Sequence, residues 1–442
     1  HKPCEENKTF AKHLCCRFVH IPCDLCVDPI LLLAGSSLGG MLAFQRIIHC
    51  QCRRIIPVSR VSQAKIHHAG IHHPVSSSLF STSTPATFHS IADFRSDTVT
   101  LPSREMLQVG MEAKLGDDVM GEDPSVLELQ EYMANLFGMK QALFVPTGTM
   151  ANLIALLAHC HTRASEIIIG QQSHLNLWEG GHVAGMGGIY AQQLPEDEDT
   201  AELDPEQIQA AVRAGIDDHW PETKVLCLEN THNMCGGVAL SPDYMHRMGQ
   251  LAHDLGLQCH VDGARIFNSL VAQKVSPREM CQNVDSISVC FSKGLGAPLG
   301  SVLIGNNEEM MQLAKRARKR CGGGMRQAGV VAAMGLYAVQ NNVTRLAEDH
   351  RRAQRIGAEL KANGLQVLRN GQIDTNIVYF SLPESSRITT TDLVRRATEE
   401  YGVKFGSGYS KGGKLFRIVT HLGVNDEDTD RVIEAIVKLS QE

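Results

Sequence analysis

The sequence predicts an α/β protein whose main body has a mostly parallel sheet covered by helices on both faces. Short β-rich runs alternate with helical stretches after residue 93, as in sheets built from crossover connections. Hydrophobic residues make up 43% and charged residues 20% of the 442-residue chain, which is ordinary for a globular protein with a sizeable core. A formal net charge of −6 and an aromatic content of 5% favour neither nucleic acid nor a membrane surface as partner.

The β-rich runs define six strands of the predicted sheet. They cover Gln141–Pro146, Glu166–Gly170, Lys224–Glu229, Gln258–Val261, Ser286–Phe291 and Ser301–Ile304. Three predicted helices begin at a capping residue followed by proline, at Asp204, Ser241 and Ser276. In a further helix, Ser125 and Glu128 predict a capping box, and Gly138 is placed to end it.

The C-terminal part of the chain follows a different pattern. A long helical region is predicted over about residues 327–362. It is followed by strand, helix, strand and helix in turn, over Asn376–Leu382, Thr391–Tyr401, Lys414–Thr420 and Asp426–Leu439. We therefore expect a large domain over residues 93–345 and a small C-terminal α+β domain over residues 346–442.

The first 92 residues differ in composition from the body. The chain begins at His1, and we expect the true start at Met41. From Met41 to Ala92 there is no Asp or Glu, whereas arginines and a serine-rich stretch are present. This composition predicts a disordered leader that serves as a mitochondrial transit peptide from Met41. The alternative is a tail without a targeting role, with the protein in the cytoplasm.

Cysteine and histidine usage does not predict a metal site. Seven of the 14 cysteines fall at or before Cys52, and the others are scattered singly through the body, which indicates a reduced compartment. The pair Cys23 and Cys26 and the histidines of 67–73 lack a second ligand pair at zinc-binding spacing. No apolar run is long enough to span a bilayer.

Three predicted strands end in residues that suit one cofactor. Asp262 and Arg265 follow one strand in HVDGAR, and Lys293 follows another in CFSKGLG. Thr147-Gly148-Thr149 leads from a third strand into a helix predicted over Met150–His159. The carboxyl ends of parallel strands meet at one edge of a sheet, where ligands bind. Taken singly, these features have simpler interpretations: a local ion pair, a surface amine and a helix cap.

Taken together, they match the needs of pyridoxal phosphate. A helix N-terminus binds phosphate, and a carboxylate can keep a pyridine nitrogen protonated. A partly desolvated lysine can form a Schiff base with an aldehyde. These are the contacts that this cofactor needs from a protein. We therefore expect Lys293 to carry the cofactor aldehyde.

Eight ordered motifs then connect the body to a known family. They are FRSDTVT, GDDVMGEDP, PTGTMANL, ENTHN, HVDGARIFN, SKGLGAPLGS, GGGMRQAG and RIVTH. From about Asp93 to the C-terminus the chain resembles the low-specificity L-threonine aldolases. The resemblance implies an aspartate-aminotransferase-like fold (pyridoxal-phosphate fold type I) with a seven-stranded, mostly parallel sheet. It also implies a homotetramer and an aldehyde-lyase that cleaves L-threonine or L-allo-threonine to glycine and acetaldehyde.

The resemblance also assigns roles to individual residues. For the cofactor it implies Lys293 as the Schiff-base lysine, Asp262 as the partner of the ring nitrogen, and further contacts from Gly148, Thr149, His174 and Arg265. For the substrate carboxylate it implies Ser96, Arg265 and Arg417. Lys319 and Arg326 match residues that reach a neighbouring subunit's phosphate, although Arg320 is an alternative to Lys319. Trp178 departs from the Tyr or Phe that relatives carry near the pocket.

Two questions stay open at this level. Cleavage needs a base for the β-hydroxyl proton, and a histidine, His174 or His219, is the available type. The alternative for His174 is that it only stacks on the cofactor ring. The nearest alternative activity is that of a serine hydroxymethyltransferase-like enzyme or a β-eliminating lyase on the same fold. A cofactor-binding protein without catalysis is a third possibility, disfavoured by the intact Lys293, Asp262 and Arg417.

Overall fold

The computed structural model describes residues 91–215, 217–409 and 413–442. The predicted transit peptide from Met41 and the cysteine and histidine groups before it and within it lie outside the described residues. The elements that follow all belong to the described part of the chain.

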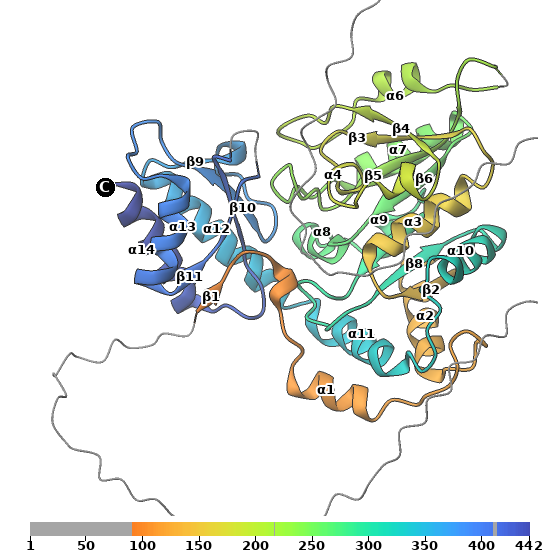
Figure 1. Cartoon of the computed structure of the whole chain (residues 1–442), viewed down its shortest axis with the longest axis horizontal. Helices are drawn as coiled ribbons and strands as arrows, with labels where there is room; N and C mark the ends of the chain where they lie inside the picture. The colour runs from red at the N-terminus through yellow and green to blue at the C-terminus, as the bar shows by residue number, and fades with distance from the viewer. Residues whose placement is uncertain (1–90, 216, 410–412) are drawn as a thin grey trace, which may run out of the picture. The chain divides into compact units, whose positions relative to one another are not determined.

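The main sheet has seven strands in the order β2-β8-β7-β6-β5-β3-β4 (Figure 1). β8 runs antiparallel to both of its neighbours, β2 and β7, and every other neighbouring pair is parallel. The strands are β2 Gln141–Val145, β3 Ser165–Gly170, β4 Tyr190–Leu194, β5 Glu222–Glu229, β6 Gln258–Asp262, β7 Ser286–Cys290 and β8 Ser301–Gly305. The prediction of a seven-stranded, mostly parallel sheet is confirmed.

The edge strand β4 is the one strand of this sheet that the sequence pattern does not predict. Its residues YAQQL contain no continuous apolar run, and none of its side chains is fully buried. An edge strand pairs on one side only, so it does not need the apolar run that marks the central strands. Its pairing with β3 is what defines it.

Alternating side chains of the sheet pack against two layers of helices. Phe144 of β2 joins a core with residues of α2 (Pro124–Phe137), α7 (Pro242–Asp254), α8 (Ile266–Gln273) and α11 (Gly329–Asn342). Its neighbours Leu143 and Val145 join a second core with α3 (Gly148–His159) and α10 (Glu308–Arg320). Successive residues of a strand point to opposite faces, so these helices cover opposite sides of the sheet. Figure 1 shows α3 and α10 side by side, as their contacts require.

Three helices begin at the capping residues that the sequence predicts, and a fourth begins earlier than predicted. The side chains of Asp204, Ser241 and Ser276 accept hydrogen bonds from the first turns of α6 (Pro205–Ala211), α7 and α9 (Pro277–Met280). In α2, however, the N-cap is Asp123, which accepts from the backbone of Ser125 and Val126. The capping box predicted at Ser125 is therefore wrong: the N-cap lies two residues earlier, and the helix begins at Pro124. Gly138 ends it with φ of 67°.

Eleven α-helices belong to this part of the described chain. They are α1 Arg104–Met111, α2 Pro124–Phe137, α3 Gly148–His159, α4 His174–Leu177, α5 His182–Gly185, α6 Pro205–Ala211, α7 Pro242–Asp254, α8 Ile266–Gln273, α9 Pro277–Met280, α10 Glu308–Arg320 and α11 Gly329–Asn342. A short 3₁₀ helix, η1, covers Asp97–Val99.

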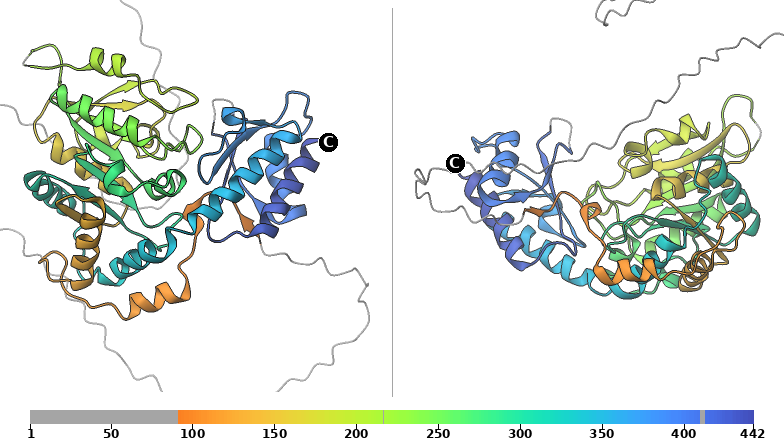
Figure 2. Two further views of the ribbon diagram at one scale, coloured as in Figure 1. Left: turned by 180° about the vertical axis from the view of Figure 1, so that it is seen from behind. Right: turned by 60° about the horizontal axis from the view of Figure 1, so that its bottom comes forward.

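The C-terminal segment forms a second, four-stranded antiparallel sheet in the order β12-β13-β10-β9. Its elements are α12 Leu346–Ala362, β9 Gln366–Val367, η2 Leu368–Gly371, β10 Ile377–Ser381, α13 Thr390–Tyr401, β11 Val403–Lys404, β12 Gly406–Ser407, β13 Leu415–Val419 and α14 Asp426–Ser440. Figure 2 shows α12 and α14 running beside one another. The predicted strand–helix–strand–helix order is present, and the predicted single helical region divides into α11 and α12.

The beginning of the described chain packs with this C-terminal segment. β1 (Ala92–Asp93) pairs in parallel with β11, and Phe94 is fully buried in the same core as α12, α13 and α14. The boundary at residues 345 and 346 stays a prediction. Within the described residues, no helix combines the length and the apolar composition needed to cross a membrane.

Candidate active site

A cavity of about 340 Å³ opens at the carboxyl ends of three strands of the main sheet. Its lining includes Gly148 and Thr149 after β2, Asp262 at the end of β6 and Lys293 after β7. The structure therefore brings together the three features that the sequence placed on separate strands, at the edge where open α/β sheets bind ligands. The lining also includes His174, Asn152 and Glu179.

The N-terminus of α3 forms one end of this cavity. The helix begins at Gly148, two residues earlier than predicted, with Thr147 as the N-cap whose Oγ1 accepts from Met150 N at 3.1 Å. The first backbone N–H groups of a helix have no partner within it, so those of Gly148 and Thr149 can bind an anion. A Cβ at Gly148 would lie 2.5 Å from Cys290 Sγ, so only glycine fits between this turn and β7.

Asp262 is buried and fixed at both carboxylate oxygens. Oδ1 accepts from the backbone N–H of Ala264 at 3.1 Å and from Ser288 Oγ at 3.5 Å. Oδ2 accepts from Asn152 Nδ2 at 3.0 Å. These donors orient the carboxylate without neutralising it, as a partner for a protonated ring nitrogen requires.

Lys293 stands on a turn that the surrounding glycines make possible. Its carbonyl accepts hydrogen bonds from Thr100 Oγ1 and from the backbone of Gly296, each at 2.9 Å. Gly296 has φ of +78°, and a Cβ there would lie 2.5 Å from a methyl carbon of Leu422. The glycines after Lys293 thus let the chain turn sharply while the amine stays at the cavity.

Arg265 is engaged by a carboxylate that lies far from it in the sequence. Its Nε and Nη2 donate to Asp97 Oδ2 and Oδ1, both at 2.7 Å. The local ion pair considered between Asp262 and Arg265 is absent from the described residues, because Asp97 takes that place from the FRSDTVT motif. The pair is buried.

Arg417 has a different environment. Its Nη1 and Nη2 donate to Asn233 Oδ1 and to the carbonyl of Arg95, each at 3.0 Å. Its guanidinium carbon lies 4.5 Å from the centroid of the Tyr409 ring, and its Nε is buried without a partner among the described residues. Among the residues that the structure describes, Arg417 is therefore a buried cation held by neutral groups only.

Neither Arg265 nor Arg417 is among the residues that line the cavity, and the other predicted site residues also lie outside it. Ser96 caps η1 by accepting from Thr98 N at 3.3 Å, and Thr98 lines the cavity. His219 lies on the loop between α6 and β5 with 85% of its side chain exposed, bound to Asp217 at 2.7 Å. Lys319 and Arg326 are exposed, and Arg326 pairs with Asp117 at 2.7 Å.

Sequence reasoning missed two buried polar residues of the site. Asn152 lies within PTGTMANL, one turn after Thr149, and its position on the helix face could have suggested it. Glu179 lies in WEGG beside two glycines and carries no local signal of burial. Its side chain is 1% exposed and accepts from His174 Nδ1 at 2.8 Å, from Asn152 Nδ2 at 2.9 Å and from His182 Nε2.

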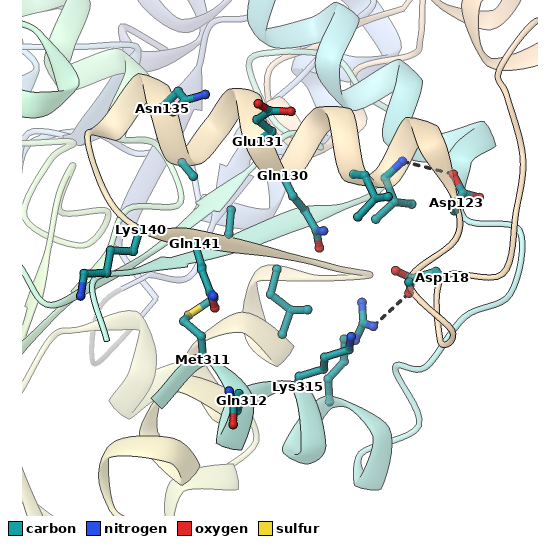
Figure 3. A pocket seen from close by; sticks show the side chains of 17 residues that line it. Asp118, Asp123, Gln130, Glu131, Asn135, Lys140, Gln141, Met311, Gln312 and Lys315 are labelled. Carbon is teal, nitrogen blue, oxygen red and sulfur yellow. Dashed lines mark hydrogen bonds and ion pairs between the residues drawn. The ribbon is translucent and has the colours of Figure 1, made fainter. Parts of the chain in front are cut away.

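A larger cavity of about 580 Å³ lies elsewhere, between α2, β2 and α10 (Figure 3). In this view Gln130 extends from α2 toward β2, the other edge strand of the main sheet. Its Oε1 accepts from Phe144 N at 2.9 Å. Arg318 donates to the carbonyl of the same Phe144 at 2.6 Å. These side chains satisfy the free edge of β2, and none of the predicted catalytic or binding residues lines this cavity.

The chain is similar to known proteins over most of its length. The family model described as beta-eliminating lyase matches residues 93–383. A probable low-specificity L-threonine aldolase 2 of Arabidopsis thaliana is 40% identical over 360 residues, covering 80% of this chain and 99% of that protein. The low specificity L-threonine aldolase of Escherichia coli K12 is 43% identical over 342 residues, covering 77% of this chain and 96% of the relative.

Solved structures agree on the fold. The threonine aldolase of Leishmania major matches with a TM-score of 0.67 and 17% identity, over 79% of this chain and 99% of that one. The aspartate aminotransferase of Thermotoga maritima matches with a TM-score of 0.61 and 12% identity, over 80% of this chain and 92% of that one. At such identities the likeness concerns the fold alone, and the predicted aspartate-aminotransferase-like fold is confirmed. By its family match and its relatives, this chain belongs to the beta-eliminating lyase family and, within it, to the low-specificity L-threonine aldolases.

Proposed function

We propose that this chain cleaves L-threonine and L-allo-threonine to glycine and acetaldehyde, with pyridoxal phosphate bound in the cavity. The observation that carries this proposal is the meeting of Lys293, Asp262 and the N-terminus of α3 around one space. In the reaction the Cα–Cβ bond breaks, the β-hydroxyl gives up its proton as acetaldehyde forms, and Cα gains a proton in glycine. Both products together contain the atoms of the substrate.

The donor set fits this cofactor at each of its reactive groups. The free N–H groups of Gly148 and Thr149 suit a phosphate, the fixed carboxylate of Asp262 suits a protonated ring nitrogen, and the amine of Lys293 suits an aldehyde. When bound, the cofactor provides a conjugated ring that withdraws electrons from the bonds of the substrate's Cα. Asp262 maintains that capacity by keeping the ring nitrogen charged.

Arg417 is the group we propose for the substrate carboxylate, together with Arg265 and Ser96. The charge of Arg265 is balanced by Asp97, whereas the described residues provide no carboxylate for Arg417. A buried guanidinium with only neutral partners favours binding of an anion. Holding the carboxylate fixes the rotation of the substrate about its N–Cα bond and so selects which bond at Cα can break.

His174 is the base favoured by the geometry of the single chain. It lines the cavity, while His219 is exposed on its loop. Burial lowers the pKa of His174, but its hydrogen bond to Glu179 and the charges of Asp262, Glu179 and Glu229 raise the pKa overall above its ordinary value. A base with a raised pKa accepts the β-hydroxyl proton readily once it is itself deprotonated.

We also propose that the enzyme is a homotetramer whose sites are shared between subunits. Large apolar side chains are exposed on and around α1, at Leu101, Leu107, Met111, Leu115 and Met120. Such a cluster favours burial against another chain. The exposed positions of Lys319 and Arg326, away from the cavity of their own chain, suit contacts to a neighbouring subunit's phosphate.

The composition of residues 41–92 supports targeting to mitochondria. A fusion of these residues to a fluorescent protein should co-localise with a mitochondrial marker, and a fusion in which their arginines are replaced should not. Diffuse fluorescence from the intact fusion would refute the targeting proposal and leave the enzymatic one unaffected.

The activity is tested by incubating the loaded enzyme with L-threonine, L-allo-threonine and L-serine separately. We expect acetaldehyde and glycine in equal amounts from the first two. Pyruvate and ammonia from serine, without acetaldehyde from either threonine, would instead identify a β-eliminating lyase. Formaldehyde and glycine as the main products would point to a serine hydroxymethyltransferase-like activity.

A further inference from the structure

Glu179 holds His174 by one particular ring atom. His174 Nδ1 lies 2.8 Å from Glu179 Oε1. Burial raises the pKa of Glu179, but its hydrogen bonds to His174, His182 and Asn152 lower the pKa overall, so the group is a carboxylate at neutral pH. A carboxylate only accepts hydrogen bonds, so the proton between the two groups belongs to His174 Nδ1.

We infer that Glu179 is a positioning residue that fixes His174 in the Nδ1–H tautomer and leaves Nε2 as the atom that takes the substrate's β-hydroxyl proton. The inference deepens the proposed function and rests on it. In neutral imidazole only one nitrogen has a free lone pair. With Nδ1 bound to Glu179, that nitrogen is Nε2, and the carboxylate then stabilises the imidazolium that forms when the proton arrives.

The backbone of His174 is fixed as well. Its N–H donates to Glu229 Oε2 at 2.6 Å, and Glu229 Oε1 accepts from the backbone of Asn233 at 2.8 Å. Asn233 in turn binds Arg417 through its side chain at 3.0 Å. One buried carboxylate at the end of β5 therefore connects the histidine to the proposed anion site, and the ring of His174 can turn only about its own side-chain bonds.

Asn152 fixes the orientation of Glu179. The amide nitrogen of Asn152 donates to Glu179 Oε1 at 2.9 Å and to Asp262 Oδ2 at 3.0 Å, so its two N–H groups serve two carboxylates. Asn152 Oδ1 faces His260 Nε2 at 3.2 Å. A flipped amide would instead turn Oδ1 toward the two carboxylates, which only accept hydrogen bonds. Asn152 thus lies between Glu179 and Asp262 and donates a hydrogen bond to each carboxylate.

The charges around His174 determine the direction of its response to mutation. Glu179, Asp262 and Glu229 are the acidic groups that face it, Lys293 lines the same cavity, and His182 reaches it only through Glu179. Removing the negative charge of Glu179 disfavours the imidazolium. The pKa of His174 should therefore fall, and the low-pH limb of the kcat profile should move to lower pH.

The substitution Glu179→Gln tests this with a side chain of the same shape. We expect kcat for L-threonine to fall on the order of 10²-fold, because base catalysis generally contributes 10²–10⁴, with KM nearly unchanged. The matched control is Glu196→Gln. Glu196 is likewise buried and bound to a histidine, His232, at 3.2 Å, but it does not line the cavity. In Glu196→Gln, the low-pH midpoint of the pH profile of kcat should be the same as in the wild type.

Binding of glycine separates positioning from structural support. Glycine has no β-hydroxyl, so its effect on the visible absorbance of the bound cofactor should survive in Glu179→Gln with a similar Kd. Two results for Glu179→Gln would overturn the inference. One is a pH profile of kcat whose low-pH midpoint does not move, and the other is a loss of glycine binding equal to the loss of cleavage. A wild-type enzyme that releases no acetaldehyde would refute the proposed function instead.

A measurement on the unmodified protein tests the tautomer directly. The loaded full-length enzyme labelled with ¹⁵N in histidine is compared with a His174→Asn sample to assign the His174 signals. Above the pKa of His174, we expect a protonated Nδ1 and an unprotonated Nε2. The opposite tautomer would overturn the inference whether or not the Glu179 variant folds.

Discussion

Asp97 and Arg265 form a doubly hydrogen-bonded pair across 168 positions of the sequence, with both N···O distances at 2.7 Å. Burial raises the pKa of Asp97, but the charge and hydrogen bonds of Arg265 lower it overall, to below its ordinary range. The pair is therefore ionised at neutral pH. It joins the start of the described chain to the end of β6 and holds Arg265 behind the cavity.

Replacing Asp97 by Asn should destabilise the protein by about 3–5 kcal/mol, because Arg265 would be left buried without its counter-ion. Urea unfolding at pH 7 and fixed protein concentration measures this. The folded-state pKa of Asp97 lies below the ordinary 3.8, so its contribution is complete above that pH and is lost as the pH falls further. The difference in the free energy of unfolding between the wild type and Asp97→Asn should therefore narrow only below pH 3.8.

The control for this prediction is the exposed pair of Asp243 and Arg247 on α7, at 3.0 Å. Asp243→Asn should cost no more than about 1 kcal/mol, as exposed pairs contribute little. Equal stability of Asp97→Asn and the wild type would show that the buried pair contributes nothing net to folding.

Lys293→Ala should abolish cleavage and the covalent attachment of the cofactor. The wild-type protein should be yellow, and borohydride should bleach it and fix the cofactor to the peptide that contains Lys293. Lys315→Ala, which removes a lysine from the larger cavity, should retain colour and label. Recovery of the label on any other lysine in the wild type would refute the assignment.

Arg417→Ala should lower kcat/KM for L-threonine about tenfold or more, since a hydrogen bond to a charged group generally contributes about 1.5–3 kcal/mol. Arg417→Lys should recover only part of the loss, because an ammonium cannot reproduce the planar fork. Steady-state kinetics measures both. Arg395→Ala, on the exposed face of α13, is the control and should match the wild type; wild-type efficiency in Arg417→Ala would place the carboxylate elsewhere.

Mixing Lys293→Ala subunits with Arg326→Ala subunits should restore activity if each subunit completes its neighbour's site. A mixed dimer then contains one site with both lesions and one with neither. Acetaldehyde release is measured after subunit exchange, and exchange itself is verified with tagged chains. A mixture as inactive as its parents would assign Arg326 to its own chain's site or to none.

The sequence by itself was enough to predict six of the seven strands of the main sheet and the cofactor chemistry of this protein. Central strands are apolar runs because both of their faces are buried, and the caps at Asp204, Ser241 and Ser276 act within three residues of their own position. Strand ends converge on one edge of a parallel sheet, so the order of the strands along the chain is enough to predict that Asp262 and Lys293 lie close together. These are local or topological rules that a single chain displays directly.

Tertiary structure alone decided which groups pair with these residues. Asp97 meets Arg265, Asn233 meets Arg417, and Asn152 meets both Asp262 and Glu179, across separations of 27 to 184 positions. The edge strand β4 likewise exists through its pairing with β3 rather than through its own residues. The sequence does not distinguish a buried carboxylate such as Glu179 from a surface glutamate, because its burial and its partners depend on how distant segments fold together. Hydrogen-bond partners act over about 3 Å in space, and no local pattern of residues specifies which distant side chain will come within that range.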